Sequence, residues 1–203
     1  DSLSSRYTKA LARSMSNAKE IKGANILNRA FNSSYTGGDG LELCSTAHLT
    51  VSGGNYKNEL TTAADLNETS LEQALIDIAG LIDNRGLKIA VKASKMIIPV
   101  NLQFVAERLM KTELRTGSAD NDVNAIRSSG MIPGGYDVNH YLTDTDAWFL
   151  KTDAPNGLKH FNRTPIKTAM EGDFDTGNVR YKARERYSFG WSDPRGIFGT
   201  PGA

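Results

Sequence analysis

The chain has 203 residues, of which 39% are hydrophobic and 23% charged, so it is long enough for one large or two small globular domains and is not a disordered tail. The formal net charge is only +1, so any electrostatic function must come from local clustering. The single cysteine, Cys44, excludes an internal disulfide framework and multi-cysteine metal sites, and no apolar run reaches the roughly 18 residues that cross a bilayer. We expect no metal, no cofactor and no membrane partner.

A long amphipathic helix is predicted at the start of the chain. Apolar residues recur every three or four positions from Leu3 to Phe31. Roughly 28 residues at about 1.5 Å each span about 42 Å, which is longer than most globular domains need. Three glycines in residues 35–40 end this periodicity, and residues 41–51 are expected to be extended.

Two further helices and several short strands are predicted in the middle of the chain. Thr69 and Ser70 begin overlapping capping-box patterns, which predict a helix that ends near residues 84–86. A third helix is predicted from Leu102 to just before residue 116. The strands predicted in this part are 87–91, 95–100 and the buried strand 147–150.

After a turn at residues 154–157, the chain is predicted to be β-structure to nearly its end. From Val179 to Trp191, apolar residues occupy odd positions and basic residues even positions, as in a strand with one apolar and one basic face. Glu185 is the misfit on the apolar face. The basic row consists of Arg180, Lys182, Arg184 and Arg186. Solvent, carboxylates of another subunit and nucleic acid all remain open as its surroundings, because a row of like charges repels itself and favours an anionic partner.

No catalytic motif is found. His48, His140 and His160 are far apart in sequence, and none has a second histidine at metal-ligand spacing. Cys44 and His48 lie four residues apart and are conceivable as a nucleophile and its base, although a lone cysteine is more often a small buried apolar residue. The glycine clusters do not match the order that phosphate-binding loops require. We therefore predict no catalytic residues.

The charge distribution changes along the chain. Residues 1–55 carry six basic and four acidic side chains, residues 56–157 ten and fourteen, and residues 158–203 eight and five. An acidic middle between basic ends predicts that residues 56–157 are inserted into a domain that is built from 1–55 and 158–203.

Four segments, taken in order, carry a resemblance to a known family. These segments are Gly38–Leu41 after the first helix, the strand–Pro–helix passage from Lys88 to Asn101, the strand Asp146–Leu150 with its Trp-Phe-Leu, and the closing stretch from Tyr181 through Asp193-Pro194-Arg195-Gly196. Together they resemble the major capsid protein of tailed bacteriophages, with the Hong Kong 97 type of fold, over nearly the whole chain.

The resemblance implies an α+β fold. A long spine helix and the closing strands would form a peripheral domain, and the inserted α/β segment an axial domain. It implies a structural head protein that assembles with itself, as pentamers and hexamers, into the icosahedral shell of a virion. The shell would be assembled in the host bacterial cytoplasm and would enclose double-stranded DNA through non-specific contacts. Portal, scaffold and decoration proteins are further candidate partners.

The chain departs from the family pattern in one respect. In the family an amino-terminal arm and an extended loop precede the spine helix, and here the helix begins almost at Asp1, so those parts either lie upstream or are absent. The nearest alternative is an encapsulin-like compartment, whose shell has the same fold. An enzyme that uses Cys44 and His48 is the competing class.

Overall fold

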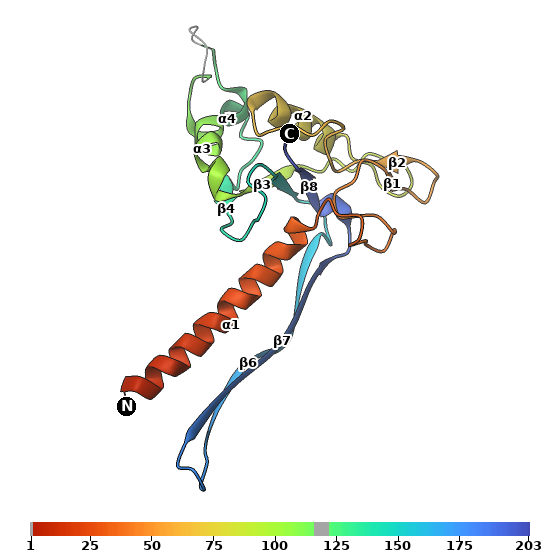
Figure 1. Ribbon diagram of the computed structural model, residues 1–203. Coiled ribbons are helices and arrows are strands. Elements are labelled where there is room, and N and C mark those ends of the chain that lie inside the picture. Colours follow the sequence, from red (N-terminus) through yellow and green to blue (C-terminus); the bar gives the residue numbers. More distant parts are fainter. Residues whose placement is uncertain (1, 116–121) are drawn as a thin grey trace.

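The computed structural model describes residues 2–115 and 122–203 of the chain. A body of packed helices and strands carries a long arm that projects from it (Figure 1). The arm consists of the helix α1 (Ser2–Asn28) and an antiparallel hairpin of β6 (Leu158–Gly172) and β7 (Val179–Trp191). Both point away from the body in the same direction, so segments far apart in sequence lie side by side.

The predicted first helix is confirmed, although it ends at Asn28 rather than at Phe31. Among the side chains of α1 that the structure describes, those near its C-terminal end enter a core. Leu27, together with Ala30 just beyond the helix, packs against Phe149 and Ile197 in a small cluster at the junction of arm and body. The apolar stripe of the helix therefore buries its C-terminal end against the body, while the rest lies outside it.

A four-stranded mixed sheet forms the centre of the body. In spatial order its strands are β4 (Tyr136–Val138), β3 (Ala93–Ile98), β5 (Trp148–Thr152) and β8 (Ile197–Thr200). The pair β3–β4 is parallel and the other two pairs are antiparallel. The predicted buried strand is confirmed as β5, because Trp148, Phe149 and Leu150 are almost completely buried. The closing segment of the chain thus returns to the body and completes its sheet.

The helices of the body are α2 (Glu68–Ala79), α3 (Gln103–Lys111), which a 3-10 turn at Val100–Leu102 precedes, and α4 (Ala125–Ser129). The predicted capping box is shifted. Asn67 is the N-cap of α2 and accepts from the Ser70 backbone N–H at 2.9 Å, while the Ser70 hydroxyl accepts from the Asn67 N–H at 3.0 Å. The helix also ends at Ala79, five residues before the predicted 84–86.

The prediction of a strand at residues 87–91 is wrong. Only an isolated bridge between Ile82 and Lys88 forms there. The backbone at Ala90 has a φ of 51°, which lies outside the extended region and interrupts any regular strand. The predicted strand at 95–100 is confirmed as β3 with shifted ends.

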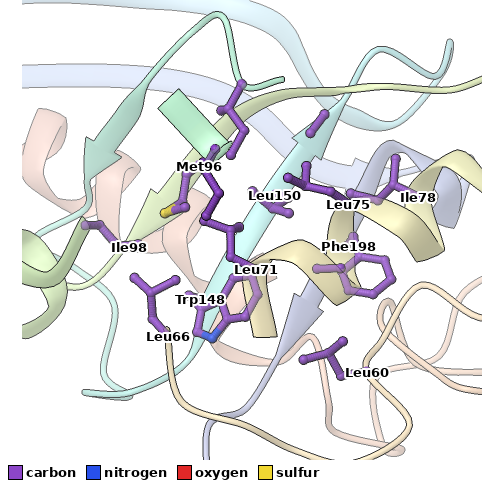
Figure 2. Packing of buried hydrophobic residues seen from close by; sticks show 14 of the residues in the cluster. Leu60, Leu66, Leu71, Leu75, Ile78, Met96, Ile98, Trp148, Leu150 and Phe198 are labelled. Carbon is purple, nitrogen blue, oxygen red and sulfur yellow. The ribbon is translucent and has the colours of Figure 1, made fainter. Parts of the chain in front are cut away.

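The main core lies between α2 and the sheet (Figure 2). Leu71 and Ile78 from α2 meet side chains of three strands. The labelled partners on the strands are Met96, Ile98, Trp148, Leu150 and Phe198. The Trp148 indole N–H donates to the Ala64 carbonyl at 3.1 Å, so its polar atom is satisfied within the core.

Three segments of the chain join the arm to the body, one after α1, one before β6 and one after β7. The small hairpin of β1 (His48–Leu49) and β2 (Asn55–Tyr56) follows α1, and a 3-10 turn at Pro194–Gly196 precedes β8. At the base of the long hairpin, Gly157 and Gly196 bring their backbones together, and a Cβ on Gly157 would lie 2.8 Å from the Gly196 Cα. Glycine is required here because any side chain would push the two segments apart.

Candidate functional site

The basic row lies along β7 and is exposed. Arg180, Lys182, Arg184 and Arg186 are all solvent-accessible, whereas the residues between them are partly buried. Arg180 pairs with Asp173 at 3.2 Å near the outer end of the hairpin. Within the residues that the structure describes, the other three members of the row make no ion pair. The row therefore presents uncompensated positive charge.

Strand pairing adds to this basic face. Directly opposed residues of an antiparallel pair point to the same side of the sheet. Lys167 lies opposite Arg184 in the register of the hairpin, and Glu171 lies opposite Arg180. The sequence did not reveal Lys167 as a member of this face, because two register shifts in β6 between Asn162 and Lys167 disturb its alternation.

The opposite face of β7 packs against α1. The Phe189 ring lies against Gly23, where a Cβ would sit 3.5 Å from the ring carbons. Lys19 and Lys22 place their ammonium groups 5.1 and 5.5 Å from the Tyr187 ring centroid. These contacts show that Tyr187 and Phe189 turn towards the helix, on the face opposite the basic row.

Glu185, the misfit in the sequence pattern, has a partner on α1. Its carboxylate lies 3.9 Å from the Lys19 ammonium group, and its side chain is only 11% exposed. A carboxylate on the inner face is acceptable because the helix supplies a cation there. Sequence alone could not pair these residues, which are far apart in the chain.

The arm has no core of its own. No side chain among residues 6–23 and 158–192 is buried. The exposed apolar residues of the arm are Tyr7, Ile21, Leu158, Phe161, Ile166, Met170, Phe174 and Val179. The 22.1 kDa chain exposes 12355 Å². A compact monomer of this mass exposes about 9,300 Å². The arm thus exposes an apolar and charged surface that is larger than expected for a compact monomer, as is typical of a surface that binds other proteins.

Asn58 is a buried hydrogen-bonding hub where the arm joins the body. Its amide nitrogen donates to the carbonyls of Leu43, Pro194 and Ile197 at 2.7, 2.9 and 3.1 Å. Its carbonyl oxygen accepts from the Ser45 N–H at 2.9 Å. One side chain therefore connects the segment after α1 to the segment after β7, so it helps to set the angle between arm and body.

A stack of three side chains reinforces the same junction. The Arg195 guanidinium lies 3.9 Å from the Tyr56 ring centroid, and His48 stacks on Tyr56 with ring centroids 5.1 Å apart. Arg195 also donates to the Ile82 carbonyl at 2.7 Å. Burial raises the pKa of Tyr56 to about 12, although the nearby Arg195 charge opposes the shift, so this hydroxyl stays neutral.

Cys44 and His48 do not form a nucleophile–base pair. His48 is fully buried, and its Nδ1 contacts the Asp39 carboxylate at 2.6 Å. Cys44 is also fully buried, and desolvation together with the charges of Glu59 and Glu42 raises its thiol pKa well above the ordinary value. No hydrogen bond joins Cys44 and His48 within the described part of the chain. A thiolate nucleophile is therefore strongly disfavoured here.

Over residues 2–115 and 122–203, no group of three or more histidine, cysteine, aspartate or glutamate side chains is arranged to hold a metal ion. None of the helices in that same part of the chain combines the length and apolar character needed to cross a membrane.

The chain matches a known family along almost its entire length. A sequence model described as phage capsid protein covers residues 1–199. The chain therefore belongs to the phage capsid protein family. No curated protein sequence matches it significantly.

Solved structures share its fold at low sequence identity. The capsid of Myoviridae phage XM1 is 15% identical with a TM-score of 0.55, and the match covers 99% of this chain and 65% of that one. A chain of Mycobacterium phage Che8 is 14% identical with a TM-score of 0.52, over 95% of this chain and 61% of that one. A phage-related protein from Bordetella bronchiseptica RB50 is 11% identical with a TM-score of 0.52, over 98% and 64%.

These likenesses confirm the mixed helix-and-sheet class and concern the fold alone. The chain spans less than two thirds of the length of each of these three structures. Family membership indicates a structural protein located in a virion capsid, and it favours the phage capsid interpretation over the encapsulin-like alternative and over an enzyme.

Proposed function

We propose that this chain is the shell-forming part of the major capsid protein of a tailed bacteriophage, with a Hong Kong 97-like fold. The arm is the observation that carries the proposal. It holds no buried side chain from 6 to 23 or from 158 to 192, so the contacts between helix and hairpin leave a large surface that other subunits can cover. Membership of the phage capsid family supports the same conclusion.

The proposal assigns the parts of the chain to two domains. Residues 1–55 and 158–203 form the peripheral domain with α1 as its spine helix, and residues 56–157 form the inserted axial domain. The side-by-side placement of α1 and the long hairpin supports this division (Figure 1). Strand β8 lies within the residues of the peripheral domain, but it pairs with β5 in the sheet of the body and so connects the two domains.

In this proposal, copies of the chain form pentamers and hexamers of an icosahedral shell around double-stranded DNA. Assembly takes place in the host bacterial cytoplasm, and portal, scaffold and decoration proteins are partners of the shell. The basic row faces either packaged DNA or the carboxylates of a neighbouring subunit, since both relieve the repulsion within it.

The test of the proposed function is self-assembly of the full-length protein. Light scattering and electron microscopy of the purified protein should show closed shells or rings, because the arm exposes a surface that only further copies can cover. A protein that stays monomeric across salt and crowding conditions would overturn the proposal.

Charge reversal tests the basic row. Arg184→Glu with Arg186→Glu should change the free energy of unfolding of the dissociated subunit little, since exposed charges contribute about 0–1 kcal/mol each. Particle yield should fall, because an unmatched intersubunit pair costs about 2–5 kcal/mol. Normal particles that lose their genome, with a weakened salt dependence, would assign the row to DNA phosphates.

The matched control is Arg85→Glu with Lys88→Glu, which reverses two exposed charges on the body. Unchanged yield and genome content in the row variant would show that the basic row is only solvated surface. Unfolding of the dissociated variant would show that the row is buried in its own domain.

A further inference from the structure

The far end of the hairpin holds a single aromatic side chain in full contact with solvent. Phe174 is 100% exposed in the turn between β6 and β7. The turn is ordered by its own backbone, because the Asp173 N–H donates to the Asn178 carbonyl at 2.8 Å and the Gly177 N–H donates to the Asp173 carbonyl at 2.9 Å. Gly177 adopts a φ of 68°, which favours glycine. These backbone hydrogen bonds therefore fix the turn that carries Phe174.

The surroundings of Phe174 are apolar and acidic. Met170 and Val179, on the two strands next to the turn, are also exposed. Residues 171–178 contain three carboxylates, Glu171, Asp173 and Asp175, and no cation. We call residues 170–179 the tip. Arg180 pairs with Asp173, so Glu171 and Asp175 carry the negative charge of the tip, which disfavours a nucleic acid partner and favours a basic protein surface.

The outer half of α1 offers such a surface. From residue 6 to 15 the helix carries three cations and no carboxylate. Arg6, Lys9 and Arg13 recur at helical spacing on one face, all are exposed, and none makes an ion pair within the described part of the chain. They border a surface hollow of about 800 Å³ in which three cations outnumber one carboxylate; its other lining residues are Ala10, Ser14, Ser16, Asn17, Glu20 and Tyr141.

A subunit cannot place its tip on its own basic face. The partly buried Leu11 and Met15 lie on the side of α1 that faces the hairpin, in line with Lys19. Lys9 and Arg13 each precede one of these residues by two positions, which is about 160° around a helix. The basic face therefore points away from the hairpin of the same chain.

We propose that the tip of one copy docks on the basic face of α1 in a second copy, with Phe174 in the hollow and Glu171 and Asp175 on Arg6, Lys9 and Arg13. This inference rests on the proposed function, because it names the surfaces that join copies of the shell protein. The tip and the N-terminal half of α1 lie at the end of the arm that is remote from the body, and the hollow extends from there along the helix to Tyr141, so arms of different copies can meet there (Figure 1). Such a contact joins two different patches and can repeat around a closed ring.

Charge exchange between the two surfaces tests the proposal. The tip variant is Glu171→Lys with Asp175→Lys, and the helix variant is Arg6→Glu with Lys9→Glu and Arg13→Glu. Each should reduce the yield of assembled particles about tenfold or more, while thermal unfolding of the dissociated subunit shifts only slightly, because Glu171→Lys places like charges at an exposed cross-strand pair with Arg180. The combined variant should regain most of the yield, because every copy then carries both reversed surfaces.

Phe174→Ser tests the apolar part of the contact. It should lower particle yield, whereas Val51→Ser, at the 89% exposed position in the β1–β2 turn, should not. Carbodiimide crosslinking of particles made from mixed light and heavy isotope-labelled subunits should join Asp175 to Lys9 in light–heavy pairs.

The results separate the two proposals. Failure of the unmodified protein to assemble would overturn the proposed function. Normal assembly of the tip variant would refute the docking contact alone. The contact would also be refuted if the tip variant and the helix variant both lose assembly and the combined variant does not recover it. The tip would then contact a different surface.

Discussion

At the scale of single residues, the junction of arm and body holds a carboxyl group with an unusual protonation behaviour. Glu59 is half-buried, and desolvation together with the nearby Glu42 charge raises its pKa from 4.5 to about 7. No ion pair compensates Glu59 within the described residues. The folded state therefore favours the protonated form of Glu59.

Glu59→Gln should remove a pH dependence of stability. Between about pH 4.5 and 7 the folded state keeps a proton that the unfolded state has lost, so the free energy of unfolding falls as pH rises through this window. The variant should have a higher Tm than the unmodified subunit at pH 8 and the same Tm at pH 4. Solvent screening of the half-exposed group limits the size of the difference.

Thermal unfolding of dissociated subunits from pH 4 to 8 measures this effect. Glu72→Gln, at an exposed position on α2, is the control and should follow the unmodified protein. Parallel curves for Glu59→Gln and the unmodified protein would show that Glu59 titrates as an ordinary surface carboxylate.

At the scale of elements, the arm is a helix laid on one face of a two-stranded hairpin. The contact is concentrated near the body, where Gly23 of α1 meets Phe189 of β7. A two-stranded hairpin is marginally stable by itself, so it depends on the helix and on its base. The space at Gly23 thus decides how closely helix and hairpin pack.

Gly23→Ala should stabilise the subunit by about 1 kcal/mol. Glycine is less favourable than alanine inside a helix by about this amount, and the added Cβ would lie 3.5 Å from the Phe189 ring, at ordinary contact distance. Denaturant unfolding of the dissociated subunit measures the change. A loss of stability would mean that the added Cβ lies closer to the Phe189 ring than 3.5 Å.

Gly199→Ala provides the opposite case. A Cβ there would lie 2.6 Å from the Phe149 ring in the closed packing of the body, so we expect a loss of about 1–3 kcal/mol. The two variants together separate the gain in helix propensity from the cost of overpacking.

At the scale of the whole molecule, stability is unevenly distributed between body and arm. The body contains the main core between α2 and the sheet, whereas residues 158–192 contain no buried side chain (Figures 1 and 2). Backbone hydrogen bonds that are not covered by buried side chains have a low free energy of local opening. The arm should therefore become rigid only when neighbouring subunits cover it.

Hydrogen–deuterium exchange should show this difference. In the dissociated subunit, amides of β6 and β7 should exchange much faster than those of β3 and β5. In assembled particles the hairpin should gain protection while the central strands stay as they were. A hairpin that is already fully protected in the free subunit would contradict this account of the arm.

The sequence by itself determined those helices and strands whose apolar residues recur at a regular spacing. The apolar spacing of residues 3–31 identified α1, the alternation from Val179 to Trp191 identified β7 and the two faces of the hairpin, and a short apolar run identified β5. These patterns are readable because the helical and extended backbones each place side chains at a fixed period. The placement of the basic row on one face of β7 follows from the same rule.

Only the tertiary structure decided which distant segments meet. Lys19 as the partner of Glu185, Lys167 as a member of the basic face and Asn58 as the hub of the junction all depend on contacts between residues far apart in the chain. The strand predicted at 87–91 failed because the apolar pattern carries no information about the positive φ at Ala90. Periodicity reports the local backbone, whereas strand register, hydrogen-bonded hubs and the exposure of Phe174 arise from packing between segments.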